Sequence, residues 1–354
     1  MPTITAKLTL VRSAAAIACA ALLGVPAVVS AATGVMPVGF VAVTNGSGSL
    51  QISQYGLDGT VVRRLTTGPA NHNYPSVSPD GRRMVFTGDE GGDSEIYSRE
   101  LGTAAVAVQL THPPLQAFSP SWSPRGDAIV YSALAPGDAA YQIFVARADG
   151  THPVRLTSSV DSGNTQPVFS PDGRRIAFLN GRKGGVDRIW VMNVDGAGAV
   201  PLSAGPRDAY PAWLDAQNVL FAREDLARGT ARIMSVGLDG RERNASPATQ
   251  HFIEPRPLPD GRAYGATVEE DGGLHLVRIS RTDGAPLMAA APSDFVVVRL
   301  PVSQREGSLF TLAWILAAPA PGTGPPLVVY SLAAAGLLLI AGFGVMAWRK
   351  TSAC

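Results

Sequence analysis

The chain has 354 residues, of which 46% are hydrophobic and only 16% charged, and its formal net charge is +1 at pH 7. Four of the 29 basic residues and none of the 28 acidic ones fall within residues 1–32 and 327–354, so the part between these ends is slightly acidic. This balance excludes a basic protein that coats nucleic acid or anionic lipid with its folded part. Two cysteines are too few for a disulfide scaffold.

Residues 1–32 are predicted to be a secretory signal peptide. Lys7 and Arg12 precede an apolar stretch over residues 13–29, and the small residues at 29–32 suit cleavage near residue 31 or 32. Two alternatives stay open. One is a retained membrane anchor, and the other is a lipoprotein signal that uses Cys19.

Residues 38–66 are predicted to form about three strands of a four-stranded unit, or blade, whose complete copies follow along the chain. Ile52 lies six residues before an Asp-Gly pair, and Leu65 begins the Leu-Thr pair that ends a blade elsewhere in the chain. By spacing, the missing first strand of this blade is expected near residues 294–300, in the apolar run 295–298. A second strand-like stretch, residues 308–315, competes with residues 38–43 for the second position.

The middle of the chain repeats one motif five times. Its leading prolines, which lie 45, 47, 44 and 44 residues apart, are Pro75, Pro120, Pro167, Pro211 and Pro255. A period of about 40–45 residues is typical of four-stranded propeller blades. Each copy holds short apolar runs separated by turns, and the Asp-Gly pairs supply the positive φ of a tight hairpin. The large apolar residues two positions after three of the prolines are expected to pack between blades: Trp122, Phe169 and Trp213.

The fold class predicted from these signals is an all-β, six-bladed β-propeller over residues 37–316. Strands from both ends of this region close the ring and remove its free edges. Asp80, Asp172, Asp195 and Asp239 are interpreted as turn formers.

The C-terminal part is predicted to anchor the chain in a membrane. Residues 317–326 are rich in Ala, Pro and Gly and form the expected linker. Residues 327–348 carry no charge and are long enough for one transmembrane helix. Arg349 and Lys350 then predict that the tail, residues 349–354, stays in the cytoplasm and that the propeller lies outside it, in the periplasm or on the cell surface. A buried core helix and a sorting signal cut near the membrane are the alternatives.

The repeated run Ser-Pro-Asp-Gly-Arg-Arg, followed by an Ile-aromatic pair, x-Asp-Gly and Leu-Thr, resembles the TolB-like β-propeller family. The resemblance covers residues 38 to about 300; it is specific in the first three full copies and weaker in the last two. It implies a propeller and a protein partner in the cell envelope. The family's namesake carries an additional α/β domain ahead of its propeller, for which residues 33–37 leave no room.

No catalytic constellation stands out. The five histidines form no metal-type pair, no phosphate-binding Gly-Lys-Ser/Thr loop occurs, and no Gly-x-Ser-x-Gly elbow follows the propeller. The acidic run at residues 89–93 is interpreted as a solvated hairpin loop, with a calcium site as the alternative. We therefore expect a non-enzymatic protein without cofactor, metal or nucleic-acid partner.

The candidate binding residues follow from the architecture, because the first strand of each blade lines the central channel. The residues that precede the leading prolines are expected to ring the mouth on the side of the loops that lead into these strands: Tyr74, Ser119, Gln166, Tyr210 and Glu254, with His72, Asn73, Asp208 and His251 nearby. Their variety suggests a site, although loop variation explains it too. The predicted function is a membrane-anchored, exported binding scaffold for an envelope protein. A channel-site enzyme or a receptor for a small ligand or polysaccharide is the alternative.

Overall fold

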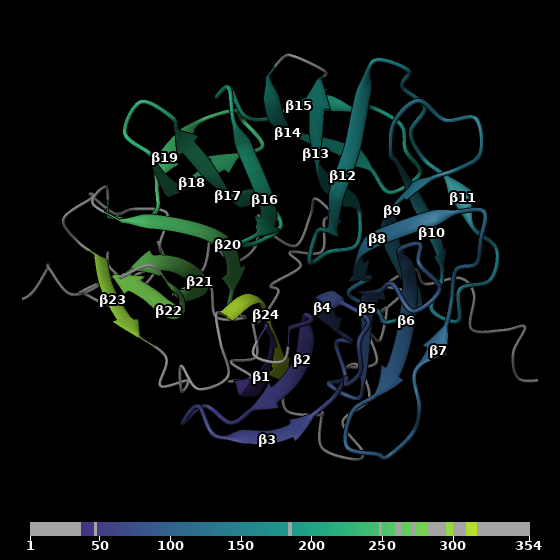
Figure 1. The fold of residues 1–354 in the computed structure, drawn as a ribbon. Coiled ribbons are helices and arrows are strands. Elements are labelled where there is room, and N and C mark those ends of the chain that lie inside the picture. Colours follow the sequence, from purple (N-terminus) through teal and green to yellow (C-terminus); the bar gives the residue numbers. More distant parts are fainter. Residues whose placement is uncertain are drawn as a thin grey trace, which may run out of the picture. The chain divides into compact units, whose positions relative to one another are not determined.

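The computed structural model describes residues 37–45, 48–182, 186–247, 250–258, 263–270, 273–281, 295–299 and 309–316. These residues form six four-stranded antiparallel sheets, which are the blades of a propeller (Figure 1). The predicted all-β, six-bladed fold is thereby confirmed. The predicted signal peptide, linker, transmembrane helix and tail lie outside the described residues. Within the described ranges, no helix has the length and apolar character needed to cross a bilayer.

Five blades are each built from four consecutive strands. Blade 1 contains β4 (His72–Val77), β5 (Arg83–Gly88), β6 (Glu95–Glu100) and β7 (Val108–Gln109). Blade 2 contains β8 (Gln116–Trp122), β9 (Ala128–Leu134), β10 (Gln142–Arg147) and β11 (Val154–Arg155). Blade 3 contains β12 (Ser162–Phe169), β13 (Arg175–Arg182), β14 (Asp187–Asn193) and β15 (Val200–Pro201). Blade 4 contains β16 (Asp208–Trp213), β17 (Asn218–Asp225), β18 (Thr230–Gly237) and β19 (Glu242–Asn244), and blade 5 contains β20 (His251–Pro257), β21 (Ala263–Glu270), β22 (Gly273–Arg281) and β23 (Phe295–Arg299).

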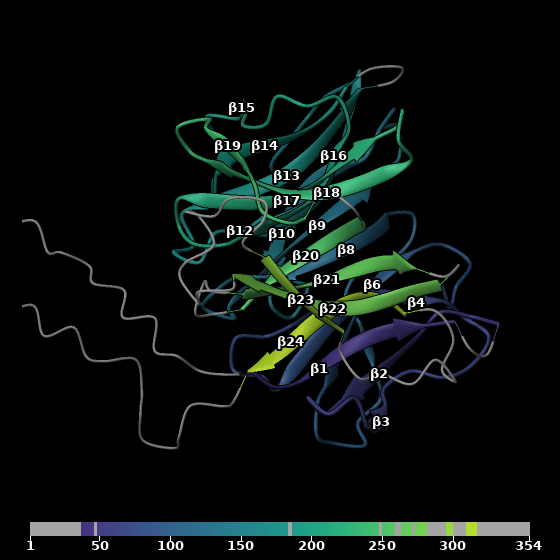
Figure 2. The same ribbon diagram turned by 90° about the vertical axis from the view of Figure 1, so that its left-hand side faces the viewer.

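Blade 6 joins the two ends of the propeller region. Its strand order is β24 (Leu309–Leu316), β1 (Pro37–Thr44), β2 (Gln51–Tyr55) and β3 (Val61–Arg64). β24 pairs antiparallel with β1 from Pro37 opposite Leu316 to Thr44 opposite Leu309, and the two strands lie side by side in Figure 2. The N-terminal segment therefore supplies three strands of this blade, as predicted.

The prediction from spacing that residues 295–298 form the first strand of blade 6 is wrong. Phe295–Arg299 is β23, which pairs with β22 as the outermost strand of blade 5. The innermost strand of blade 6 is instead β24, the stretch that was expected to compete for the second position. The spacing argument failed because 13 residues separate β22 from β23. This long connection puts the fourth strand of blade 5 where the first strand of blade 6 was expected.

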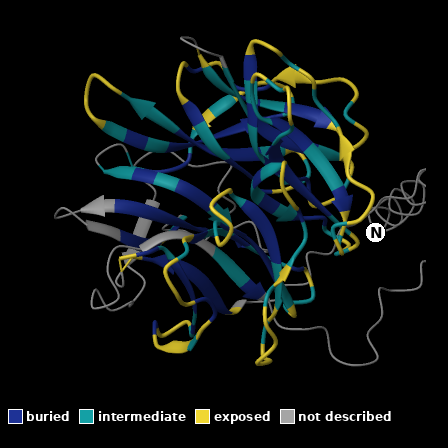
Figure 3. Cartoon of the chain, turned by 45° about the vertical axis from the view of Figure 1, so that its right-hand side comes forward, coloured by how far each residue is buried: buried dark blue, intermediate teal, exposed yellow. Residues whose placement is uncertain are grey.

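The blades are held together by buried apolar side chains that pack between neighbouring sheets. Figure 3 shows that buried positions lie mainly along the strands and exposed ones mainly in the connections. Trp122, Phe169 and Trp213 end three of the inner strands and are 6%, 7% and 6% exposed, which confirms their predicted packing. The Trp122 indole N–H donates to the Ser76 carbonyl of the preceding blade at 3.1 Å. Trp213 of blade 4 repeats this bond, donating to the Val168 carbonyl of blade 3 at 3.0 Å.

The closing strand carries the same contact. Trp314 of β24 donates its indole N–H to the Arg256 carbonyl of blade 5 at 2.9 Å. Each acceptor carbonyl belongs to the residue that follows a leading proline, so blade 6 docks on blade 5 as blade 4 docks on blade 3. The Ala313-Trp314 pair corresponds to Ala212-Trp213 of blade 4.

The aspartates of the Asp-Gly pairs act as turn formers, as predicted. Asp80 Oδ1 accepts hydrogen bonds from the Ser78 hydroxyl at 2.6 Å and from the Arg82 backbone N–H at 3.0 Å. Asp172 makes the matching pair of bonds in blade 3. Asp195 and Asp239 each accept one backbone N–H two residues ahead.

Removing β24 is expected to open the ring. A chain that ends at residue 300 leaves the edge of β1 unpaired and deletes the Trp314 contact, whereas a chain that ends at residue 320 keeps both. Circular dichroism should show the shorter chain melting several degrees lower, because a loss of about 1 kcal/mol already lowers the Tm of a domain of this size by roughly 2–4 °C. Equal melting of the two chains would show that the ring closes without β24.

Candidate functional site

A β-bulge interrupts the inner strand of each of blades 1–5. The bulge falls at the residue before the leading proline, where the register shifts against the second strand. These residues have left-handed backbones, with φ of 51°, 55°, 53°, 57° and 53°, and are Tyr74, Ser119, Gln166, Tyr210 and Glu254. A left-handed conformation costs an L-residue roughly 1–2 kcal/mol. The following proline loses no ladder bond, since it has no N–H to donate.

Side chains of the preceding blade bind the backbone of three of these residues. The Ser119 N–H donates to the Thr87 hydroxyl at 3.1 Å, and the Gln166 N–H donates to the Ser132 hydroxyl at 3.1 Å. The Tyr210 N–H donates to Gln166 Oε1 at 2.8 Å. The strained positions are thus stabilised across the blade boundaries.

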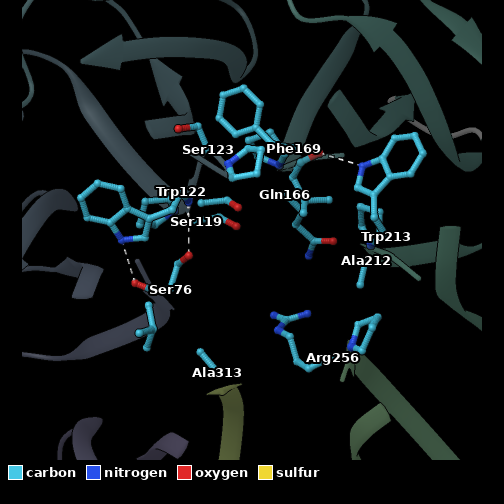
Figure 4. A pocket seen from close by; sticks show the side chains of 18 of the residues that line it. Ser76, Ser119, Trp122, Ser123, Gln166, Phe169, Ala212, Trp213, Arg256 and Ala313 are labelled. Atoms are coloured by element: carbon cyan, nitrogen blue, oxygen red, sulfur yellow. Dashed lines mark hydrogen bonds between the residues drawn. The ribbon is translucent and has the colours of Figure 1, made fainter. Parts of the chain in front are cut away.

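Four of these five bulges line a pocket of about 320 Å³ at the centre of the propeller. Its lining includes one residue or more from every inner strand: Tyr74, Ser119, Gln166, Tyr210, Arg256 and Trp314. Figure 4 shows the Arg256 guanidinium and the Gln166 amide pointing into this space from blades 5 and 3. We call it the central pocket.

The central pocket reaches toward the side of the turns that follow the inner strands of blades 1–3, which read Ser-Pro-Asp-Gly in blades 1 and 3 and Ser-Pro-Arg-Gly in blade 2. Pro79, Pro124 and Pro171 of these turns belong to its lining. The sequence had placed the mouth on the opposite side, where the chain leads into each first strand. The difference arises because the residues before the leading prolines lie inside the inner strands rather than in the loops ahead of them.

The other predicted site residues lie outside the lining of the central pocket. His72 is buried, with Nδ1 3.2 Å from Gln51 Oε1 and Nε2 2.6 Å from Glu90 Oε1. Asp208 is fully buried and accepts two hydrogen bonds from the Arg223 guanidinium at 2.6 and 2.9 Å.

Three further predicted site residues also lie outside the lining of the central pocket: His251, Asn73 and Glu254. His251 contacts the Gly229 carbonyl at 3.4 Å, and Asn73 is half-buried. Glu254 is buried, and its charge acts on Arg256, Tyr74 and Tyr210 of the lining.

Among the described residues, Arg256 is the one charged side chain in this lining. Burial lowers the pKa of its guanidinium, and the Glu254 carboxylate opposes that shift. Burial, followed by the charge of Glu254, raises the pKa of Tyr74 and raises the pKa of Tyr210 to about 12. Both phenols therefore stay protonated at neutral pH and can donate hydrogen bonds together with the guanidinium.

Sequence reasoning missed Arg256. The residues that directly follow the leading prolines are Ser76, Ser121, Val168, Ala212 and Arg256, and only the last is charged. This one charged position in an otherwise uncharged series was the signal in the sequence that could have identified it.

The described residues contain no group of three or more His, Cys, Asp or Glu side chains that could hold a metal ion. The acidic run at residues 89–93 divides among separate partners. Asp89 binds Asn71, Glu90 binds His72, and Asp93 accepts a bond from Gln116.

The ionisation of Tyr210 tests the geometry of the central pocket. Its folded-state pKa of about 12 lies above the ordinary value of about 10. The neutral phenol thus stabilises the fold below pH ~10, and this contribution is lost as the pH rises through ~12. The phenolate absorbance of the native protein minus that of Tyr210→Phe should show one group titrating near the higher value. A difference curve centred near the ordinary value would place this phenol in open solvent.

Comparisons with known proteins agree with the propeller fold. The family model described as the TolB beta propeller domain matches residues 109–290, which is half of the chain. A protein TolB homolog from Chlorobium chlorochromatii is 35% identical over 144 residues, covering 40% of this chain and 31% of that protein. The chain thus spans about a third of the length of such curated relatives.

Two solved structures share the fold. TolB from Acinetobacter baumannii aligns with a TM-score of 0.62 at 18% identity, over 80% of this chain and 67% of that one. Oligogalacturonate lyase from Vibrio parahaemolyticus aligns with a TM-score of 0.52 at 10% identity, over 74% of each chain. At these identities the likeness concerns the fold alone. Together with the family match and the six observed blades, it leads to one assignment: the chain belongs to the TolB β-propeller family.

Proposed function

We propose that this protein is an exported, membrane-anchored, non-enzymatic scaffold whose central pocket receives a segment of another envelope protein. The observation that carries the proposal is the convergence of hydrogen-bond donors from different blades on one small hollow. The predicted signal peptide and transmembrane helix support the location, and membership of the TolB family agrees with a partner in the envelope.

The donors of the central pocket favour an anionic group on the partner. Gln166 uses its Oε1 for the Tyr210 backbone, which leaves its Nε2 for a ligand. The two tyrosine hydroxyls and the Arg256 guanidinium add further donors. An aspartate, a glutamate or a chain-terminal carboxylate would satisfy several of these groups at once, and guanidinium–carboxylate pairs are among the strong hydrogen bonds in proteins.

The size and rigidity of the pocket fit a short inserted segment. A volume of about 320 Å³ lies at the lower end of ordinary ligand sites. Prolines of the inner strands, and of the turns that follow these strands, form much of the wall. Because the φ angle of proline is fixed, the wall has little backbone freedom to lose on binding. A small carboxylate-bearing ligand fits the same space, so a small-ligand receptor or channel-site enzyme remains the second candidate.

Site-specific photocrosslinking tests the proposal in the full chain. A photoreactive phenylalanine analogue at position 210 lies in the lining of the central pocket, and the same analogue at position 154 lies on the exposed outer edge of blade 2. Illumination of intact cells should join one discrete protein to position 210 and none to position 154. Arg256→Gln should lower the yield of that adduct about tenfold, since hydrogen bonds to charged groups contribute about 1.5–3 kcal/mol.

Two results would count against the scaffold. Adducts from position 154 alone would move the interface to the outer rim. If a small carboxylic acid abolished every adduct and was itself turned over, the enzyme alternative would hold. Melting curves on the same preparations establish that Arg256→Gln remains folded.

A further inference from the structure

A second hollow lies between blades 2 and 3. Its volume is about 670 Å³, and its lining shares no residue with the central pocket. One wall is a face of blade 3, and the other is formed by residues 156–159, which follow β11 of blade 2. We call this hollow the inter-blade groove.

A row of polar side chains crosses the blade 3 wall. Asn164, Asn180 and Arg188 lie directly opposite one another on β12, β13 and β14, so they share one face of the sheet. Asn180 Nδ2 donates to Asn164 Oδ1 at 2.7 Å and to the Ser162 hydroxyl at 3.0 Å. Asn164 Nδ2 donates in turn to Gln142 Oε1 at 3.0 Å. These bonds hold the amides in place before any ligand arrives.

Arg188 stands out in this row. Its Nε is buried without a hydrogen-bond partner, and no ion pair joins it to another described residue. The described lining of the groove contains no Asp or Glu. An unsatisfied buried donor in a native fold is rare and calls for an explanation, and the planar guanidinium matches a carboxylate through two parallel N–H bonds. The groove is therefore suited to an anionic ligand.

An aromatic wall stands beside the polar row. Trp190 follows Arg188 by two residues on β14, so both side chains lie on the same face of the strand. Trp190 is half-buried and pairs with Phe178 across the sheet, with ring centroids 6.4 Å apart. A flat apolar surface next to amides and hydroxyls complements a ring that has C–H groups on its face and hydroxyls at its edge, which is the chemistry of a sugar.

We propose that the inter-blade groove binds an acidic oligosaccharide, with Arg188 paired to a sugar carboxylate and Trp190 packed against the ring. The site is separate from the central pocket and does not depend on the function proposed for it. An acidic peptide is the less favoured occupant. Extended peptides bind mainly through main-chain hydrogen bonds to a strand edge, whereas this wall is a sheet face whose strands are already paired.

Calorimetric titration of the full chain with trigalacturonate tests the site. We expect saturable binding of the acid, and binding at least about tenfold weaker for its fully methyl-esterified form, which keeps the sugar rings and removes the charges. Arg188→Gln and Trp190→Leu should each weaken binding of the acid by a similar factor. The matched control is Arg232→Gln, because Arg232 precedes Ile233 on β18 as Arg188 precedes Ile189 on β14; this control should leave the affinity unchanged.

Several outcomes would overturn the proposal. These are no binding of trigalacturonate at millimolar concentration, equal affinity for the acid and the ester, or a folded Arg188→Gln protein that binds like the native one. Triglutamate binding as tightly as the sugar would assign the groove to peptides instead. The comparison of acid and ester uses the native protein alone, so it decides the matter even if a variant melts early.

Discussion

The left-handed residue before each leading proline is the constraint on which the centre of this propeller depends. Within the described residues, all six non-glycine positions of positive φ directly precede a proline, and five of them are the bulges of the inner strands. A bulge adds one residue to the inner strand and re-aims the side chains that follow it. The same backbone that closes around the axis thereby supplies the walls of the central pocket.

At three of the five bulges, hydrogen bonds across a blade boundary offset the cost of this conformation. Ser119 and Gln166 each donate a backbone N–H to a hydroxyl of the preceding blade. The side-chain Oε1 of Gln166 in turn accepts a hydrogen bond from the Tyr210 N–H of the following blade. The indole bonds of Trp122, Trp213 and Trp314 also join neighbouring blades, and they run between inner strands: β8 to β4, β16 to β12 and β24 to β20. The contacts that shape the pocket are therefore also contacts between blades. A substitution in one inner strand is expected to alter the conformation of the inner strand of the next blade.

Much of this arrangement could be predicted from the sequence, because it is periodic. The proline spacing predicts the blades, and the large apolar residue that ends three of the copies predicts the packing between them. The closing strand was assigned wrongly because β24 has no leading proline and lies beyond the 13-residue connection between β22 and β23, although residues 308–315 already read as a strand.

Contacts between particular polar side chains could not be predicted for another reason. His72 meets Gln51 and Glu90, and Asp208 meets Arg223, through contacts that no local pattern encodes. These residues looked like candidates for a ligand site but serve the fold. Neither Arg256 nor Arg188 was predicted as a site residue, yet among the described residues each is the only charged side chain in the lining of its hollow. A period of 44–47 residues carries no information about such exceptions, which depend on three-dimensional neighbours.

The central claim is that hydrogen bonds between blades hold the bulges that shape the central pocket. Ser132→Ala tests it most directly, since it removes the acceptor of the Gln166 N–H and leaves Thr87, the acceptor of the Ser119 N–H, in place. Native-state amide exchange should become about tenfold faster at Gln166, because a hydrogen bond contributes about 0.5–1.5 kcal/mol, and should stay unchanged at Ser119. Unaltered exchange at Gln166, or equal acceleration at both amides, would contradict the account.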